Sequence, residues 1–346
     1  MENQPFVSII LVSFNSEEYI VDCISSLSVQ SYQNFNIIFV DNNSSDNSLE
    51  VVENEFQQVF TIHNNTNSGF AQACNIGIQK ALEDDKTKYV VCLNLDTMVD
   101  ENWLKELVST AENNFNVGSV QSKILCFNHP DRINTAVNNL TFLGFGYCGD
   151  YLQSSSKITE LQEIPYSSGS SVLFSRKALE KSGLFDKDYF LYHEDVDLGL
   201  RLQLFGYTNL LEPRSICFHK YSFTKNKKVY FLERNRLITL YKNFSTRTLW
   251  LISFAFLIKE IGLLFFLLFS GYIHSKLKGY VYIIKHFRNI HHKRKVIQKK
   301  RAISDKKIAE LLVGRIEFQE LNIYFLRKLA NPFFDAYWKM VKQMIK

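Results

Sequence analysis

The segment that decides the fold class is Phe6-Val7-Ser8-Ile9-Ile10-Leu11-Val12. This nearly continuous run of apolar and β-branched residues is typical of a strand that is buried on both faces of a parallel sheet. The residues that follow predict a helix, because Asn15 is a good N-cap residue and Glu18 stands three positions later, the spacing of a capping box. The N-terminal segment therefore predicts a buried strand followed directly by a helix.

The same alternation of strand and helix recurs four times in the first hundred residues. Further strands are expected over 35–40, 59–62 and 89–93, and further helices over 48–56 and 70–82. The alternation indicates an α/β fold with a doubly wound, mostly parallel sheet, in which ligands bind beyond the carboxyl ends of the strands. The mixed region that follows predicts strands over 118–125, 208–211 and 215–218 and helices over 177–181 and 194–205.

Composition excludes several classes of protein. The chain has 346 residues, of which 46% are hydrophobic and 22% charged, so it is no disordered or low-complexity protein. Its six cysteines lie far apart without a C-x-x-C motif, which favours a reduced, cytoplasmic interior over a zinc site or a disulfide framework. Charge is uneven: residues 271–307 carry twelve Lys and Arg against Asp305 alone, whereas the whole chain carries +5.

An apolar region precedes this basic stretch. The segments 249–258 and 261–269 flank Lys259-Glu260, and together they are long enough to cross a bilayer. Basic residues on both sides favour a segment that lies in the plane of the membrane or re-enters it, at the inner face of the cell membrane and near anionic lipids. The alternatives are a buried helix pair of a soluble domain and, for the basic stretch, an ordinary solvated helix. Nucleic acid is not expected as a partner.

Acidic residues follow the predicted strands or open a helix: Asp41, Asp96, and Glu194-Asp195 with Asp197. Carboxylates in these positions suggest a nucleotide and a divalent metal ion, Mg²⁺ or Mn²⁺, which prefer oxygen ligands and bridge to phosphates. The sequence has no G-x-x-x-x-G-K-[ST] loop and no G-x-G-x-x-G after the first strand, which disfavours P-loop enzymes and dehydrogenases. The remaining possibility is a nucleotide whose diphosphate is held through a metal ion and not by a glycine-rich loop.

Several motifs resemble the family-2 inverting glycosyltransferases of GT-A fold. They occur in order at 7–15, 39–46, 67–77 and 93–96, where Leu93-Asn94-Leu95-Asp96 is similar to the D-x-D region of that family. In the second half, Ser168-Gly169-Ser170, the segments 183–186 and 190–198, and Arg201 resemble the rhamnosyltransferase-like branch. The resemblance covers about residues 5 to 240 and leaves the C-terminal region unmatched.

The resemblance implies roles for individual residues on the donor side. Ser13 and Asn15 would line the nucleotide pocket, and Asp41 would contact the base or the ribose. Gly69 and Asn75 would shape the donor site. Asn94 replaces the first aspartate of D-x-D, so the metal ion would be held mainly by Asp96 and the diphosphate, with His219 near both. For His219, a purely structural, hydrogen-bonded histidine is the alternative.

On the acceptor side, the resemblance makes Asp195 the expected general base, with Glu194 binding the acceptor or orienting the loop. A carboxylate in reach of the attacking hydroxyl can remove its proton as the new bond forms. Asp197 and Arg201 are spaced i, i+4, which favours an intrahelical ion pair, and helix capping is the alternative for all three acids. Arg234-Asn235-Arg236 either reaches phosphates or forms a solvated basic face.

These inferences predict three parts: a nucleotide-sugar-binding half (1–120), an acceptor-binding and catalytic half of the same GT-A domain (121–245), and a helical, membrane-associated tail (246–346). The expected activity is metal-dependent, inverting transfer of rhamnose from a nucleotide diphosphate sugar, in cell-surface polysaccharide synthesis. The expected acceptor is a glycan, either free or carried on a polyprenyl diphosphate. The alternatives are a UDP-hexose or UDP-HexNAc transferase of the same fold, and a non-catalytic scaffold that binds sugar or lipid.

Overall fold

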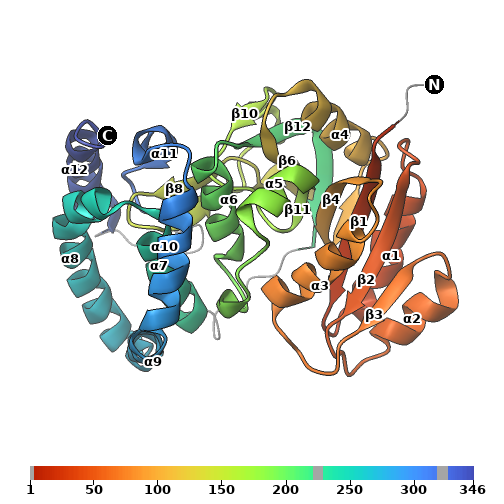
Figure 1. Ribbon diagram of the computed structural model, residues 1–346, viewed down its shortest axis with the longest axis horizontal. Helices are drawn as coiled ribbons and strands as arrows, with labels where there is room; N and C mark the ends of the chain where they lie inside the picture. Colours follow the sequence, from red (N-terminus) through yellow and green to blue (C-terminus); the bar gives the residue numbers. More distant parts are fainter. Residues whose placement is uncertain (1–3, 221–228, 318–325) are drawn as a thin grey trace.

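A computed structural model describes residues 4–220, 229–317 and 326–346 of the chain (Figure 1). The first four long strands are parallel neighbours in one sheet, in the order β4-β1-β2-β3. Their bounds are β1 (Phe6–Ser13), β2 (Phe35–Asp41), β3 (Phe60–His63) and β4 (Thr87–Asn94). These bounds lie within two residues of the strands that the sequence predicts, and the predicted doubly wound α/β arrangement is confirmed for this half.

The sheet continues through the second half of the chain. Strand β11 (Ser171–Ser175) runs antiparallel between β4 and β6 (Val117–Cys126), and β12 (Thr208–His219) runs parallel to β6. Short strands complete it: β5 (Thr97–Val99), β7 (His129–Thr135) and β10 (Gln162–Glu163). The prediction of two strands over 208–218 was wrong. They form one strand, β12, whose register shifts between Glu212 and Ile216 where Pro213 cannot donate a ladder hydrogen bond.

Helices cover both faces of the sheet. On one face lie α1 (Glu17–Ser28), α2 (Ser48–Glu55) and α4 (Trp103–Asn113), packed on side chains such as Ile9 and Leu11. On the other lie α3 (Phe70–Leu82), α5 (Arg176–Ser182) and α6 (Glu194–Leu204), packed on Ile10 and its neighbours. Because successive residues of β1 face opposite helix layers, both kinds of position are apolar, which explains the continuous apolar run.

The first helix begins one residue later than the sequence suggests. Ser16, not Asn15, precedes α1 at the N-cap, and Asn15 has a left-handed backbone with φ +55°. Its carboxamide oxygen accepts the N–H of Ser45, 2.7 Å away, so it bonds to the next βα loop and not to its own helix. Asparagine tolerates this backbone region better than most residues, and a tertiary contact has overridden the local capping preference.

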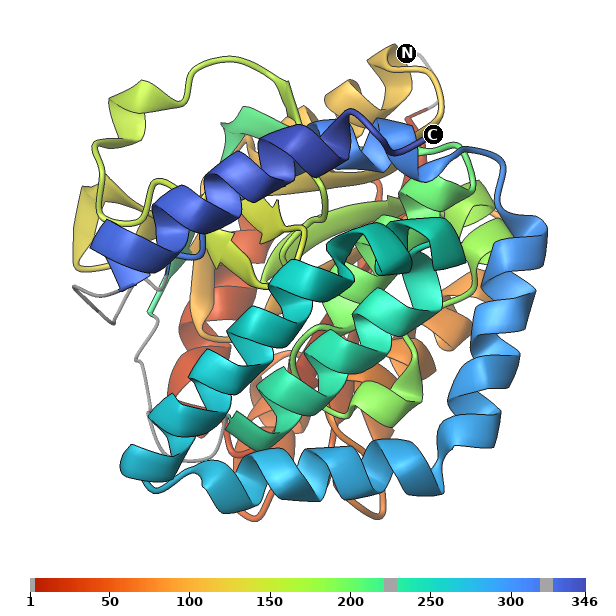
Figure 2. The same ribbon diagram turned by 90° about the vertical axis from the view of Figure 1, so that its left-hand side faces the viewer.

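Residues 229–317 and 326–346 form a helical extension that packs beside α6 (Figures 1 and 2). Its helices are α7 (Val229–Asn243), α8 (Thr246–Phe269), α9 (Ile273–Lys285), α10 (Phe287–Lys300), α11 (Asp305–Leu311) and α12 (Asn331–Lys342). A small second sheet joins β13 (Leu312–Val313) to β8 (Asn138–Thr141) and β9 (Gly146–Cys148), so the extension pairs with the middle of the chain. Short turns η1 (Ser155–Lys157), η2 (Lys187–Tyr189) and η3 (Leu326–Ala330) complete the described elements.

Helix α8 joins both predicted apolar segments into one 24-residue helix. Within the described ranges it is the one helix long and apolar enough to cross a membrane, and only 28% of its most apolar window is buried inside the molecule. Lys259 and Glu260 face inward, where Glu260 accepts hydrogen bonds from Arg236 and Tyr280, each at 2.6 Å. The two charges that make its hydropathy ambiguous are therefore neutralised within the protein.

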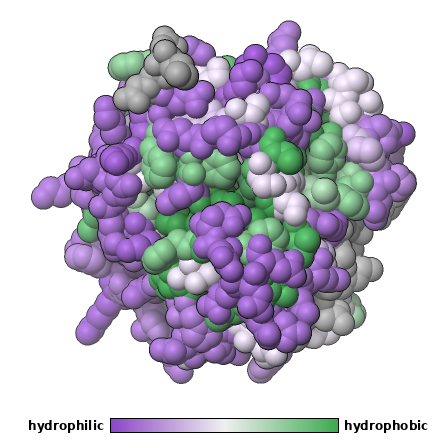
Figure 3. Space-filling view, turned by 90° about the vertical axis from the view of Figure 1, so that its right-hand side faces the viewer, coloured by the Kyte–Doolittle hydropathy of each residue, from purple (hydrophilic) through white to green (hydrophobic). Residues whose placement is uncertain are grey.

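On the face of the molecule opposite the extension, hydrophilic residues form most of the surface and apolar residues gather near the middle (Figure 3).

Candidate active site

The carboxyl ends of six parallel strands meet at one edge of the sheet. Strands β1, β2, β3, β4, β6 and β12 all end there, and the antiparallel β11 begins there. This edge carries the predicted residues Ser13, Asp41, Asn94 and His219, which are strand-terminal, and Asp96 in the turn after β4. The topology thus brings together polar side chains from both halves of the chain, where α/β folds bind ligands.

Asp96 and His219 form the centre of this edge. Pairing of β5 with β12 sets Thr97 opposite His219, and the Nε2 atom of His219 lies 3.2 Å from Oδ1 of Asp96. The Nδ1 atom of His219 lies 3.1 Å from Oδ1 of Asn134, which fixes the orientation of the ring and leaves Nε2 facing the Asp96 carboxylate. In metal-ligating histidines the other ring nitrogen is commonly held by such a partner.

Asp96 and His219 fit a divalent cation that takes its remaining ligands from a bound substrate. In the described part of the chain no group of three or more His, Cys, Asp or Glu side chains could hold a metal ion. Asp96 and His219 could supply two ligands, and Mg²⁺ or Mn²⁺ commonly takes its others from water and substrate phosphates. Asn94 ends β4 beside them; its N–H donates to the carbonyl of Ser170, and its carbonyl accepts the Thr97 hydroxyl.

The loops after β1 and β2 are bonded to each other. Both carboxylate oxygens of Asp41 lie 3.2–3.3 Å from the N–H of Ser44, and the Ser44 hydroxyl lies 3.4 Å from that of Ser13 and accepts the N–H of Asn15. Asp41 also lies 2.9 Å from Nδ1 of His63, which ends β3. The motifs did not single out His63, although its position directly after a predicted strand is the signal that could have found it.

Gly69 lies at the entrance of α3 with φ +82°, a conformation that favours glycine. A Cβ atom there would lie 2.5 Å from the Phe190 ring and 2.6 Å from the Phe190 carbonyl oxygen. Asn75 differs from our expectation. Its amide group donates to the Phe185 carbonyl and its oxygen accepts the Phe185 N–H, so the buried side chain is occupied in fixing the 183–186 turn and does not support a donor-binding role.

Asp195 and Glu194 open α6. Asp195 accepts hydrogen bonds from the N–H groups of Val196, at 2.7 Å, and Gly169. Burial raises the pKa of Asp195 to about 6. Burial and the neighbouring Asp195 raise the pKa of Glu194 to about 8, and its Oε2 atom is buried without a hydrogen-bond partner. Asp195 is therefore ionised at neutral pH and more basic than an ordinary aspartate.

The segment Ser168–Ser170 joins this acid pair to the metal side. The Ser170 carbonyl accepts the N–H of Asn94 at 3.0 Å, and the adjacent Gly169 bonds Asp195. The Asn94-Leu95-Asp96 turn and Asp195 thus contact the same three-residue segment.

Two further expectations were tested by the contacts. The Asp197–Arg201 ion pair is confirmed at 2.9 Å, whereas Arg234-Asn235-Arg236 forms no solvated face, because all three side chains are buried.

The loop before α6 has an unusual backbone. Phe190, Tyr192 and His193 all have φ between +64° and +68°. Such sparsely populated backbone at non-glycine residues costs on the order of 1–3 kcal/mol each and clusters at functional sites. The side chains that hold this loop are Arg234 and Asn235 of α7, whose roles the sequence pattern did not reveal. The contact depends on how α7 packs against α6, which no local motif encodes.

Comparisons with known proteins agree with this arrangement. Residues 8–183, slightly more than half of the chain, match the family described as Glycosyl transferase family 2. A poly-beta-1,6-N-acetyl-D-glucosamine synthase of Staphylococcus epidermidis is 28% identical over 219 residues, which are 61% of this chain and 49% of that protein. An uncharacterized glycosyltransferase of Haemophilus influenzae is 32% identical over 125 residues, 35% of this chain and 38% of that protein. The matched part of the chain spans about half the length of the Staphylococcus epidermidis protein and less than half of the Haemophilus influenzae protein.

Two solved structures show the fold. Staphylococcus aureus TarS 1-349 has a TM-score of 0.51 at 15% identity, covering 98% of this chain and 92% of that one. GalNAc-T7, solved with UDP, GalNAc and Mn²⁺, has a TM-score of 0.57 at 16% identity, covering 69% of this chain and 48% of that one. The expected GT-A fold with a mixed, mostly parallel sheet and C-terminal helices is confirmed. The rhamnosyltransferase-like branch finds no support among these proteins. The chain belongs to glycosyl transferase family 2.

Proposed function

We propose that this glycosyltransferase transfers a sugar from a nucleoside diphosphate sugar to a hydroxyl group of a glycan acceptor, with inversion at the anomeric carbon and with Mg²⁺ or Mn²⁺. One observation carries the proposal: the Asp96–His219 pair and Asp195 lie at the same sheet edge and are connected through Ser168–Ser170. One group would hold a cation and the diphosphate, and the other would accept a proton from the incoming alcohol.

The chemistry is a single displacement. The acceptor oxygen bonds to the anomeric carbon, the bond from that carbon to the β-phosphate oxygen breaks, and the nucleoside diphosphate departs with the electron pair. Asp195 accepts the hydroxyl proton, a contribution of about 10²–10⁴ in rate. A bound cation would offset the negative charge on the departing diphosphate. The Asp96 carboxylate and the Nε2 atom of His219 would hold it, with Asn94 beside them.

For the donor, we propose a UDP-N-acetylhexosamine. The support is the name of the Staphylococcus epidermidis relative, a polymer synthase for N-acetyl-D-glucosamine, and the UDP in the solved structures of TarS and GalNAc-T7. Ser13, Asn15, Asp41 and His63 would line the nucleotide side of the site, and Gly69, packed against Phe190, would shape the donor side. The donor that the family resemblance suggested, dTDP-rhamnose, serves below as the donor against which UDP-N-acetylhexosamines are compared.

For the acceptor, we propose a glycan carried on a membrane lipid such as a polyprenyl diphosphate, reached from the cytoplasmic face. The support is the outer side of α8 and α9, where large apolar side chains are exposed. They are Trp250, Phe254, Leu257, Ile258, Ile261, Phe265, Phe266, Leu268 and Phe269 of α8, and Leu277, Val281 and Ile284 of α9. Exposed Lys278, Lys285 and Arg288 stand beside them, which suits anionic headgroups.

The donor assignment is tested with purified protein and Mn²⁺ by measuring release of the nucleoside diphosphate from a panel of nucleotide sugars. We expect UDP-N-acetylglucosamine or UDP-N-acetylgalactosamine to turn over at least tenfold faster than dTDP-rhamnose. A faster rhamnosyl donor would overturn the donor assignment. Binding without turnover of any donor, with or without oligosaccharide acceptors, would favour a scaffold.

Membrane association is tested by co-sedimentation with vesicles of phosphatidylglycerol or of phosphatidylcholine. The variant Phe265→Ser with Phe269→Ser should lose binding to the anionic vesicles, because both rings are exposed on α8. The matched control is Phe115→Ser, whose ring is also exposed, even more than those of Phe265 and Phe269, but lies on the loop before β6. Equal binding of all three proteins would contradict the proposal.

A further inference from the structure

The loop between α5 and α6 carries the proposed base into the site. Its residues 186–193 include η2 and end directly before Glu194 and Asp195. Positive φ angles at Phe190, Tyr192 and His193 would relax in an unsupported loop, because L-residues populate such backbone sparsely. Some part of the structure must therefore hold the loop in place.

The side chain of Asn235 on α7 provides much of this support. Its amide Nδ2 lies 3.0 Å from the carbonyl of Tyr189, 2.9 Å from that of Leu191 and 2.7 Å from that of Tyr192. Two amide hydrogens are thus shared among three carbonyl oxygens of one loop, and Asn235 is fully buried. Such a contact set fixes the path of the backbone and leaves no polar capacity of the amide nitrogen for a ligand.

The guanidinium of Arg234 adds two bonds to the same loop. Its Nη2 atom donates to the carbonyls of Asp188 and Tyr189, each at 2.8 Å, while its plane lies over the Tyr282 ring of α9. On the loop itself, the Phe190 ring stacks on Phe231 of α7 at 5.3 Å between ring centroids. Five main-chain bonds and one stacked ring therefore tie the loop to α7.

The other side of the loop lies against the donor side of the site. The Phe190 carbonyl accepts the N–H of Ala71 in the first turn of α3, and the same residue fills the space beside Gly69. The loop therefore lies between α7 and the entrance of α3, with Asp195 following on the same backbone. A shift of the loop would move the proposed base relative to the donor.

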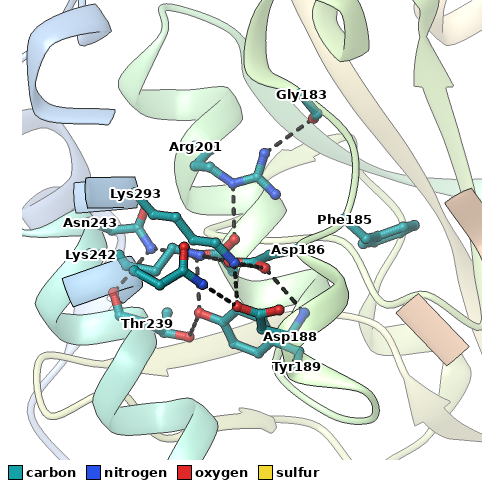
Figure 4. Close-up of polar contacts among 12 residues, drawn as sticks. Gly183, Phe185, Asp186, Asp188, Tyr189, Arg201, Thr239, Lys242, Asn243 and Lys293 are labelled. Carbon is teal, nitrogen blue, oxygen red and sulfur yellow. Dashed lines mark hydrogen bonds and ion pairs between the residues drawn. The ribbon is translucent and has the colours of Figure 1, made fainter. Parts of the chain in front are cut away.

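Ion pairs fix the beginning of the loop, at Asp186 and Asp188 (Figure 4). Lys242 of α7 and Lys293 of α10 both reach the carboxylate of Asp186, and Lys242 also lies 3.0 Å from Asp197. Lys293 bonds Asp188 at 2.7 Å as well. Two helices of the extension thus hold the beginning of the loop, while Asn235 and Arg234 hold its middle.

We propose that Asn235, assisted by Arg234, is a positioning residue for the proposed base Asp195: it holds the 188–192 loop in its strained, positive-φ conformation and so sets the carboxylate against the donor. This inference rests on the proposed function. It gives the helical extension a part in catalysis that is separate from contact with a membrane. Asn235 touches no substrate in this role and acts only through the loop.

The test is a double-mutant cycle with Asn235→Ala and Asp195→Asn, measured as kcat and KM for the donor and as nucleotide affinity. Asn235→Ala alone should lower kcat about 10- to 100-fold while the affinity for UDP with Mn²⁺ changes less than threefold. In the Asp195→Asn background the same substitution should lower the residual rate less than threefold, because groups that act through one another are not additive.

The matched control is Asn331→Ala in α12. Asn331 is also a buried asparagine whose amide bonds backbone, at the N–H and carbonyl of Ile316, but it is distant in the chain from the loop. It should lower thermal stability without lowering kcat tenfold. Asn235→Gln, which keeps an amide donor, should recover part of the lost kcat.

The outcomes separate the two levels of the proposal. A wild-type chain that turns over, with Asn235→Ala lowering the rate equally in both backgrounds, would overturn the positioning role alone. An unchanged kcat in Asn235→Ala, or loss only in proportion to unfolded protein as judged by circular dichroism, would overturn it as well. Absence of turnover by the wild-type chain with every donor would overturn the proposed function and this inference with it.

Discussion

The Nε2 atom of His219 lies 3.2 Å from Oδ1 of Asp96, and the pairing of β5 with β12 holds the two residues in that position. One comes from the turn after β4 and the other from the last position of β12, so the two residues lie far apart in the sequence. Asn134 fixes the imidazole through Nδ1. The relationship makes the proposed cation site a property of the tertiary fold.

If His219 is a metal ligand, His219→Ala should raise the Mn²⁺ concentration for half-maximal activity by about 10- to 100-fold, the range typical of losing a metal-site contact. Saturating Mn²⁺ should restore most of the rate. Activity measured against free Mn²⁺ checks this, with Glu53→Gln on the exposed side of α2 as a control for charge and expression. An unchanged Mn²⁺ requirement in His219→Ala would show that the histidine is structural.

The pH dependence of kcat/KM should follow Asp195. Burial raises the pKa of this carboxyl to about 6, and a general base must be ionised to accept a proton. The rate should therefore rise about tenfold per pH unit below pH 6 and level off above it. A rate profile between pH 4.5 and 8 at saturating Mn²⁺ checks this. A flat profile across pH 5–7 would be inconsistent with Asp195 as the base.

Gly69→Ala should impair the donor side. The added Cβ would meet Phe190 at 2.5 Å, and φ +82° is unfavourable for alanine. We expect a loss of stability of about 1–3 kcal/mol and weaker donor binding. The control is Gly262→Ala on the exposed side of α8, where no atom lies within 4 Å of the new Cβ and helix propensity favours alanine by about 0.5–1 kcal/mol. Urea unfolding and UDP titration distinguish the two, and equal stability of both variants would contradict the close contact.

Lys242→Met should destabilise the fold strongly. Burial alone would raise the pKa of Asp186, but Lys242 and Lys293 outweigh it and hold the pKa well below its usual range. Removing one cation leaves buried aspartates less compensated, at a cost of about 3 kcal/mol. Because the lowered pKa contributes stability above about pH 4 and loses it as the pH falls further, the difference from wild type should shrink below pH 4.

Urea unfolding at pH 7 and at pH 3.5 measures this effect. The control is Lys80→Met, which removes an exposed ion pair with Glu83 and should change the free energy of unfolding by less than about 0.5 kcal/mol. Equal effects of the two substitutions at pH 7 would mean that the buried cluster contributes no more than a surface pair.

The sequence predicted the sheet well because each strand of the first half is buried on both faces, so that apolar runs such as Phe6–Val12 carry a strong signal. Strand ends then indicated Asp41 and Asp96, the family resemblance indicated His219, and the structure brings all three to one edge of the sheet. The sequence could not reveal that the Asn75 side chain hydrogen-bonds the Phe185 backbone, nor that Asn235 is buried. Both side chains bond residues far away in the chain, and such contacts leave no local periodicity.

The basic stretch shows a similar limit. Twelve cationic residues over 271–307 predict a charged surface, yet Lys276 and Arg294 are buried. Lys276 lies 2.8 Å from Glu260 inside the extension, and Arg294 donates to the Phe244 carbonyl. Composition gives the amount of charge but not which charges a neighbouring helix neutralises.

The most direct measurement compares turnover with nucleotide binding in Asp195→Asn. The substitution keeps the shape of the side chain and removes the group that would accept the proton, while the Asp96–His219 pair is unchanged. Transfer should fall by a factor of 10² or more, and the affinity for UDP with Mn²⁺ should stay within threefold of wild type. Near-normal turnover in Asp195→Asn, or a loss of UDP affinity that parallels the loss of rate, would contradict a site with separate base and diphosphate sides.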